Sequence, residues 1–488
     1  MKGLSLKFLD SLETATAYDQ PYGGGRVKST HLFCKMKIIK NIIIANDTEA
    51  FAGIIKAIKN PAKRIEKIDK EDFLCGRFLL WENDNKVIIT PRKIQEEIIE
   101  QIRLLGQKSI ENWFPKKVTT NLSQAICEDR PLFEKLKKAI KQNPKVILSP
   151  YCYTSEFSRL VKKLRDIGLR FEVDQQSIDR SSSIVSYLGS KTGFRNELQK
   201  INEHAVIIPQ PNFFIHDRIG KIYDSVGRFY KGHMSCVIKT NSGEGGWGVL
   251  FVQPNKFNTK GKLFTWLGKE FRRDSIWRHG PYLVEEFINS DGGTEHSPSL
   301  EIFIHGNKPL ITYACNQVVD RNGRFIGVFM GKDCLNANTE NRIRRIGKTI
   351  GRRYANLGYR GFFDIDFIVS PEGRPYPIET NVRRTGGTHV FDFVHWFFGP
   401  KWYKKIVALS SDSFEYGVKT LSARNILHKI GPLRFPMNNS KEGVIIAAIA
   451  STVPVFSYII IGSNKKRALE IREKLIKIFP YRYETDNA

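Results

Sequence analysis

"RGFFDIDFIVSPEGRPYPIETNVRRTGGTHV", residues 360–390, is the most informative segment of this chain. Two strand-like runs flank the turn sequence SPEGR, which predicts a β-hairpin with its tip at the Glu-Gly pair. With that tip, Asp366 faces Glu379 and Asp364 faces Asn381. Because alternate residues of a strand share a face, all four side chains point the same way, with opposed Cβ atoms about 5 Å apart.

Three acidic groups and an amide on one face repel one another unless a cation joins them. Oxygen donors alone favour a hard divalent ion, Mg²⁺ or Mn²⁺, of the kind that bridges nucleotide phosphates. We therefore expect Asp366, Glu379 and Asn381 to bind such a metal. Arg383 continues the alternation and places a forked cation where a phosphoryl group would lie.

A second motif, "IKTNSGEGGWGVLF" at 238–251, places Lys239 before a glycine-rich loop. The glycines are Gly243, Gly245, Gly246 and Gly248. A dinucleotide-binding loop would run directly into a helix, whereas this one runs into the strand-like sequence VLFVQ. A kinase loop would have its lysine downstream, and a Walker A loop at 347–349 would need glycine where Arg342 stands. The pattern predicts a flexible β-flap over phosphate, and a ligand-free structural hairpin is the alternative.

The first third of the chain alternates strand and helix patterns, which predicts an α/β layer around a parallel sheet. Strands are expected within 37–47, 86–90 and 144–151, and helices within 48–60, 91–106 and 155–168. Pro91 is expected to open the second of these helices, and Gly168 to close the third.

Beyond residue 185 the pattern changes. Residues 186–201 are expected to be helical and 205–214 to form a short strand. Strand patterns then dominate to about residue 400, interrupted by a basic amphipathic helix within 341–359, whose charged face is either solvated or a nucleic-acid site. A last helix is expected within 464–479.

The apolar segment 443–462 is about as long as a membrane span and carries no charge. Pro454 and the Ser451-Thr452 pair divide it into two halves rich in Val and Ile. We therefore expect two buried strands joined by a turn, and no insertion into a membrane.

Composition is that of a globular protein with room for about three domains in its 488 residues. The net charge of +27 favours polyanionic partners or anionic substrates such as nucleotides. The seven cysteines form no C-x-x-C pair and no zinc-ligand spacing, so reduced thiols in a cytoplasmic protein are expected. Asp10 and Glu13 interrupt the apolar N-terminus, which argues against a secretory signal and leaves a mobile leader.

The region 186–400 resembles the ATP-grasp superfamily on the motifs above. The resemblance implies two nucleotide-contacting lysines, a metal site on the hairpin and a neighbouring arginine that stabilises the transferred phosphoryl group. These residues are Lys191 and Lys239, then Asp366, Glu379 and Asn381, and then Arg383. It also implies that the glycine loop covers ATP.

Two further segments carry the resemblance. "YLVEEFI", 282–288, is similar to the hinge whose backbone contacts adenine, with Glu285 and Ile288 at the bonding positions and Glu286 beside them. In "SLEIFIHG", Glu301 would face the ribose or the metal, although the insertion before it can shift the alignment by two residues.

"ETNVRRTGGTHV" and "YIIIGSNKKRALEIREKL" are similar to the peptide-ligase branch of the superfamily that includes the pheganomycin ligase. The branch implies three units: a pre-ATP-grasp α/β domain with the leader (1–185), an ATP-grasp domain of two α+β subdomains (186–410) and a small C-terminal α+β unit (411–488). Arg384 either binds a second carboxylate or reaches solvent, and His389 is either a base for the amine or a packed residue.

The implied activity joins a small-molecule carboxylate to an amine, such as an amino acid or peptide, through an acylphosphate, with release of ADP and phosphate. One alternative is a nucleic-acid-binding protein with a regulatory or vestigial ATP site, which the net charge suggests. The other is an ATP-grasp carboxylase or carbamoyl-phosphate-type enzyme.

Overall fold

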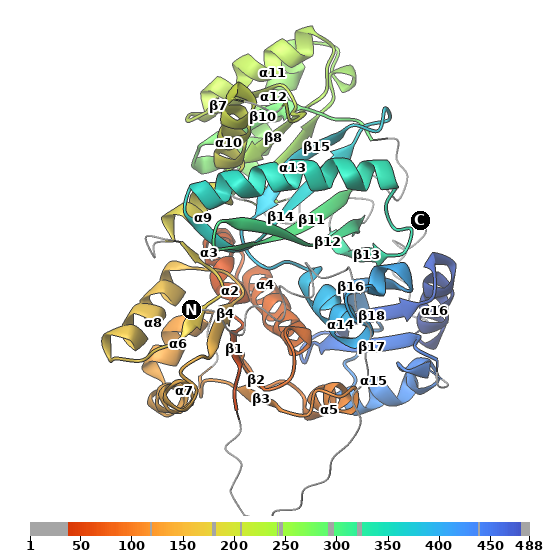
Figure 1. The fold of residues 1–488 in the computed structure, drawn as a ribbon. Coiled ribbons are helices and arrows are strands. Elements are labelled where there is room, and N and C mark those ends of the chain that lie inside the picture. The colour runs from red at the N-terminus through yellow and green to blue at the C-terminus, as the bar shows by residue number, and fades with distance from the viewer. Residues whose placement is uncertain are drawn as a thin grey trace, which may run out of the picture.

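The computed structural model describes residues 38–117, 120–177, 182–204, 207–241, 243, 247–290, 297–319, 325–437 and 440–479. The expected N-terminal leader and the loop residues Gly245 and Gly246 lie outside the described residues. Within these ranges the strands form one parallel sheet and two antiparallel sheets, with helices packed around them (Figure 1). The mixed α/β and α+β fold class is confirmed.

The first third folds around a five-stranded parallel sheet with the order β3-β2-β1-β4-β5. Its strands are β1 (Asn41–Ile44), β2 (Lys86–Ile89), β3 (Ile110–Trp113), β4 (Ile147–Pro150) and β5 (Glu172–Val173). The helices are α2 (Asp47–Ala50), α3 (Ala52–Ala57), α4 (Pro61–Leu74), α5 (Glu96–Leu104), α6 (Leu122–Glu128), α7 (Arg130–Gln142) and α8 (Ser155–Asp166). Uninterrupted apolar runs such as 42–44 suit a sheet that is buried on both faces.

One helix boundary in this region was predicted wrongly. The helix expected to open at Pro91 begins at Glu96. The amide of Ile94 donates a hydrogen bond to the side chain of Asn112 on β3 (2.9 Å), which holds the intervening backbone against the sheet. Proline suits the first turn of a helix but does not require one to follow.

The helix expected over 186–201 is two helices, α9 (Ser183–Leu188) and α10 (Lys191–His204). The hydroxyl oxygen of Ser190 accepts a hydrogen bond from the amide of Gly193 (3.1 Å), so it acts as the N-cap of α10. The break places Lys191 at the first position of the second helix.

The next unit is a four-stranded antiparallel sheet with the order β7-β10-β8-β9. Its elements are β7 (Phe213–His216), β8 (Cys236–Thr240), β9 (Val249–Val252) and β10 (Tyr282–Glu286), with α11 (Ile222–Lys231) and α12 (Lys260–Arg273). The predicted order of strand, glycine loop and strand is confirmed by β8 and β9. The strand expected over 205–214 begins only at Phe213, because Pro209 and Pro211 cannot donate to a ladder.

The third sheet is antiparallel and runs in the order β15-β14-β11-β12-β13-β16-β18-β17, with β6 (Gln176–Ser177) paired to β14. Its other strands are β11 (Pro298–His305), β12 (Lys308–Val319), β13 (Phe325–Gly331), β14 (Tyr359–Val369), β15 (Pro375–Asn381), β16 (Val407–Glu415), β17 (Gly443–Ile449) and β18 (Val455–Gly462). The basic helix α13 (Ala337–Asn356) lies across one face of this sheet (Figure 1). The remaining helices are α14 (Thr388–Phe398), α15 (Ala423–Lys429) and α16 (Lys465–Ile478).

The apolar segment 443–462 forms the antiparallel pair of β17 and β18, as predicted, and both strands are almost wholly buried. Among the residues that the structure covers, no helix combines the length and the apolar character needed to cross a bilayer. β18 pairs with β16, which spans the expected unit boundary at 410/411 and joins these strands to the central sheet.

Candidate active site

The hairpin of β14 and β15 has the predicted register at its acidic residues. Asp364 pairs with Asn381, and Asp366 pairs with Glu379. Closer to the turn, a bulge next to Phe367 shifts the pairing by one residue. The four polar side chains line a cavity of about 920 Å³.

The carboxyl groups on this face repel one another. Burial, followed by the charges of Asp364 and Glu379, raises the pKa of Asp366 well above its ordinary value. Burial also raises the pKa of Asp364 to about 6, against the opposing effect of Arg383. Asp366 accepts a hydrogen bond from Gln317 (2.5 Å). A cation at this face would relieve the repulsion, so the donor set fits a hard divalent ion in its chemistry.

The side chains are turned toward other partners. In the described part of the chain, no group of three His, Cys, Asp or Glu side chains is placed to hold a metal ion. Glu379 lies 3.1 Å from the Nζ of Lys191. Asn381 donates to Asp366 (3.2 Å) and accepts from Arg383 (2.7 Å). To bind a metal, Glu379 and Asn381 would therefore have to give up these contacts and turn toward the ion.

Two lysines and an arginine approach the acidic face from α10 and β8. The Nζ of Lys239 contacts the carboxylate of Glu285, and Arg195 lies 2.8 Å from the same carboxylate. Burial lowers the pKa of Lys239 even though Glu285 opposes the change. For Glu285, burial would raise the pKa, but the charges of Arg195 and Lys239 outweigh it and the pKa falls. Arg195 was not among the predicted site residues, although it lies four residues after Lys191 and thus on the same helix face.

The described loop glycines have steric reasons for their identity. A Cβ on Gly243 would lie 2.3 Å from the carbonyl oxygen of Trp247, and Gly248 has a φ of +78°. The Nζ of Lys191 donates to the carbonyl of Gly243 (3.4 Å), and the amide of Thr240 donates to that of Gly248 (2.8 Å). Only glycine permits this close approach of the loop ends.

The expected hinge, residues 282–288, comprises β10 and the two residues that follow it. The backbone amide of Glu286 donates to the backbone carbonyl of Asn212 (2.8 Å), and the Glu286 carboxylate accepts from the side-chain amide of Asn212 (2.8 Å). Glu285 reaches the site through its side chain, as described above. Ile288 follows the strand in irregular structure.

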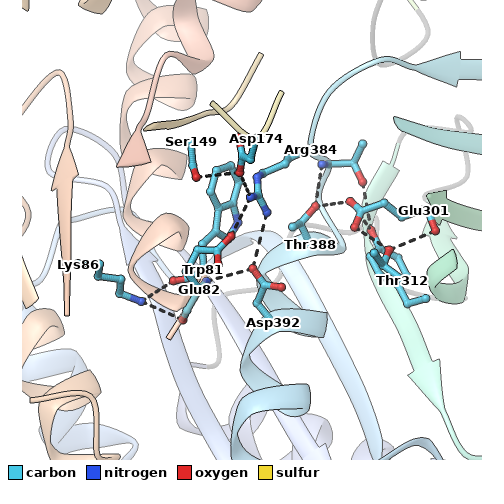
Figure 2. Close-up of polar contacts among 12 residues, drawn as sticks. Trp81, Glu82, Lys86, Ser149, Asp174, Glu301, Thr312, Arg384, Thr388 and Asp392 are labelled. Carbon is cyan, nitrogen blue, oxygen red and sulfur yellow. Dashed lines mark hydrogen bonds and ion pairs between the residues drawn. The ribbon is translucent and has the colours of Figure 1, made fainter. Parts of the chain in front are cut away.

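Glu301 is fully buried on β11, and it is not among the described residues that line the cavity. Its carboxyl group accepts hydrogen bonds from the hydroxyls of Thr312 (2.9 Å) and Thr388 (Figure 2). Ser299, two residues earlier, pairs with Asp366 and does line the cavity. If the alignment is shifted by two residues, as the insertion allows, then Ser299 and not Glu301 is the residue of β11 that faces the site.

We expect Glu301 to make folding stability depend on pH. Burial raises its pKa to about 8 from an ordinary value of 4.5, so the folded state holds a proton that the unfolded chain releases. The stability from this group is fully present below the ordinary value and is lost as the pH rises through about 8. Glu301→Gln is neutral at every pH and should lose less stability than the wild type between about pH 6 and pH 9. Urea unfolding at both pH values measures this, and equal losses in the two proteins would contradict a buried, protonated Glu301.

Arg384 is almost fully buried in a charged cluster that joins the first third of the chain to the hairpin (Figure 2). Its Nη2 lies 2.8 Å from the carboxylate of Glu82 and 2.6 Å from that of Asp174. The guanidinium group also lies over the rings of Trp81 and Phe362. Arg384 does not reach solvent, and the carboxylates that it binds belong to the protein itself.

Arg383 points the other way and lines the cavity. Its Nε donates to the hydroxyl of Tyr151 (3.1 Å), and its guanidinium group lies over the rings of Tyr151 and Phe51. The carbonyl of Tyr151 also accepts from the amide of Arg384 (3.2 Å). Tyr151, which directly follows β4, thus contacts both arginines, and no local sequence pattern indicated this role.

His389 lies in the core at the start of α14. Burial lowers its pKa well below the ordinary value, so the imidazole is neutral. Of the two alternatives for this residue, the structure supports a packed side chain.

No protein-family model matches the sequence. The chain is 28% identical over 292 residues to the L-propargylglycine--L-glutamate ligase of Streptantibioticus cattleyicolor. The match takes in 57% of this chain and 56% of that protein, so the chain spans little more than half the length of the curated relative.

Solved structures resemble nearly the whole chain at low sequence identity. The N5-carboxyaminoimidazole synthetase of Staphylococcus aureus, complexed with ADP, has a TM-score of 0.52 and 11% identity, covering 91% of this chain and 99% of its own. The biotin carboxylase domain of the Hydrogenobacter thermophilus 2-oxoglutarate carboxylase, in complex with MgADP, ADP and bicarbonate, has a TM-score of 0.50 and 12% identity, covering 91% and 90%.

Proposed function

We propose, because the chain has the ATP-grasp fold, that it is an ATP-dependent ligase that joins a carboxylate to an amine and releases ADP and phosphate. The observation that carries this proposal is a single cavity edge where the opposed Asp366 and Glu379 meet Lys191, with Lys239 buried behind it. Two acids and two lysines so placed suit a nucleotide triphosphate and its metal.

In this proposal Lys191 and Lys239 neutralise the nucleotide phosphates, and Asp366, Glu379 and Asn381 hold Mg²⁺ or Mn²⁺. When bound, the metal supplies positive charge at the phosphate oxygens. Lys191 exchanges its contact with Glu379 for a phosphate oxygen. The proposed cover of the nucleotide comprises Gly243, Gly245, Gly246, Gly248 and the backbone of 285–288.

The chemistry proceeds in two substitutions. A carboxylate oxygen of the acyl substrate attacks the γ phosphorus of ATP, the bond to the ADP oxygen breaks, and an acylphosphate forms. The amine nitrogen then attacks the acyl carbon, the bond to phosphate breaks, and the amine loses a proton. Arg383 faces this reaction from the cavity wall and stabilises the charge on the transferred group.

The substrate class follows from the curated relative, whose name describes the joining of two amino acids. We therefore propose amino acids or short peptides as the acid and the amine. A cytoplasmic location is part of the proposal, because ATP is available there and the six described cysteines are all free thiols. A screen of ADP release over amino acids, peptides and bicarbonate, with mass spectrometry of the products, distinguishes a ligase from a carboxylase.

Lys239→Ala is expected to weaken the binding of a non-hydrolysable ATP analogue at least tenfold. The substitution removes a buried cation from the phosphate site, while Arg195 continues to pair with Glu285. Calorimetric titration measures the affinity, and thermal melting shows whether the variant is folded. Lys269→Ala, at an exposed position on α12, is the matched control. Unchanged affinity for the ATP analogue in a folded Lys239→Ala protein would contradict the proposed nucleotide site.

A further inference from the structure

A row of lysines on α4 lines the same cavity as the acidic hairpin. Lys63, Lys67 and Lys70 follow one another at spacings of four and three residues, which places them on one helix face. All three line the cavity, as does Lys59 just before the helix. At a rise of 1.5 Å per residue, the Cα atoms of Lys63 and Lys70 lie about 10 Å apart along the helix axis.

Two acidic residues of the same helix form ion pairs outside the cavity. Asp69 and Asp72 both bind the side chain of Arg92, at 2.7 and 2.8 Å. Neither acid is among the described residues that line the cavity, and neither is Arg92. The arrangement therefore separates the charges of α4: its lysines face the cavity, and these two acids face another partner.

The α4 side of the cavity wall keeps an excess of positive charge. Glu71 is the α4 acid that lines the cavity, and it pairs with Lys67 at 2.7 Å. Across the described ranges, no acidic oxygen lies within 4.0 Å of the Nζ of Lys63 or Lys70. Both residues are exposed. Two ammonium groups that pair with no acid of the described ranges, on the wall of a cavity, favour an anionic occupant.

We infer that the substrate lying along α4 is an acidic peptide that carries at least two carboxylates besides its reacting group. An extended chain advances about 3.3 Å per residue, so a span of about 10 Å corresponds to three residues. Separate lysines suit carboxylates spaced along a chain, whereas paired guanidinium groups suit a compact phosphate. The inference names the substrate class of the proposed ligase and rests on that function.

The test compares two peptides that differ in charge but hardly in shape. Triglutamate and triglutamine are titrated into the full chain with Mg²⁺ and a non-hydrolysable ATP analogue, and binding is measured by calorimetry. Triglutamate is expected to bind at least tenfold more tightly. The double variant Lys63→Glu, Lys70→Glu is expected to weaken triglutamate binding at least tenfold while leaving triglutamine binding within about twofold.

A matched control reverses two exposed lysines elsewhere. Lys138→Glu with Lys141→Glu changes the net charge equally on α7, away from the cavity, and should leave triglutamate affinity unchanged. Equal affinity of the wild type for the two peptides would overturn the inference, as would an equal loss in both double variants. Titration of the nucleotide analogue alone separates the two proposals: failure to bind it in the wild type counts against the ATP site, not against the lysine row. Thermal melting confirms that each variant is folded.

Discussion

Glu379→Gln is expected to reduce ATP-dependent ADP formation about a thousandfold or more, the scale of loss when a charged group is removed from a phosphoryl-transfer site. The amide keeps the size of the side chain but removes the charge that balances Lys191 and would bind the metal. Burial would raise the pKa of Glu379, but the charges of Lys191 and Lys239 lower it, so the wild-type residue is an anion. ADP release under saturating ATP measures the effect.

Glu372→Gln is the control for this variant. It makes the same chemical change at an exposed position of the same hairpin, outside the cavity. The control should retain full activity, and both variants should melt close to the wild type. A Glu379→Gln enzyme that turns over near the wild-type rate would rule out a catalytic role for the acidic pair.

Arg384→Ala is expected to cost about 3 to 5 kcal/mol of unfolding free energy, because it removes a buried cation and leaves partly buried carboxylates without their partner. Glu82 and Asp174 both depend on Arg384, and Asp174 otherwise accepts only from Ser149 among the hydrogen bonds described. Urea unfolding gives the value. Adding Glu82→Gln and Asp174→Asn to Arg384→Ala should recover part of the lost unfolding free energy, since neither position then carries an unpaired negative charge. A loss below about 1 kcal/mol for Arg384→Ala would show that water reaches this cluster.

The pairing at the site could be predicted from the sequence because strand alternation has a period of two and the turn is short. The sequence did not reveal the bulge. Near the turn, Val369 pairs with Pro375, one residue out of the register of Asp366 and Glu379. Pro377 has no amide hydrogen to donate, and the bulge beside it restores the predicted pairing. The predicted pairing of the acidic residues is therefore correct only because of the bulge, which counting residues back from the turn does not include.

The contacts of the arginines could not be predicted. Strand alternation correctly separates Arg384 from Arg383, but the partners of Arg384 lie 302 and 210 residues away in the chain. The anchor of Arg383, Tyr151, is likewise distant in sequence and directly follows β4 of the parallel sheet. Periodicity describes one element at a time, so it gives the face of a side chain and not the element that packs against it.

The continuity of the large antiparallel sheet limits how this chain can be recombined with its relatives. Since β18 is hydrogen-bonded to β16 and β16 to β13, a chimaera joined at residue 410 would divide β16 between two parents. Its new half would have to match the neighbouring strands in register and in side-chain volume. Exchange of β11 to β18 as one block preserves every strand pair of that path, and α4 with its lysines lies outside the block. A donor sheet with its acidic hairpin could then be combined with this chain's own α4 and lysine-bearing β8, so that the proposed metal ligands and the proposed charge preference for substrate could be exchanged separately.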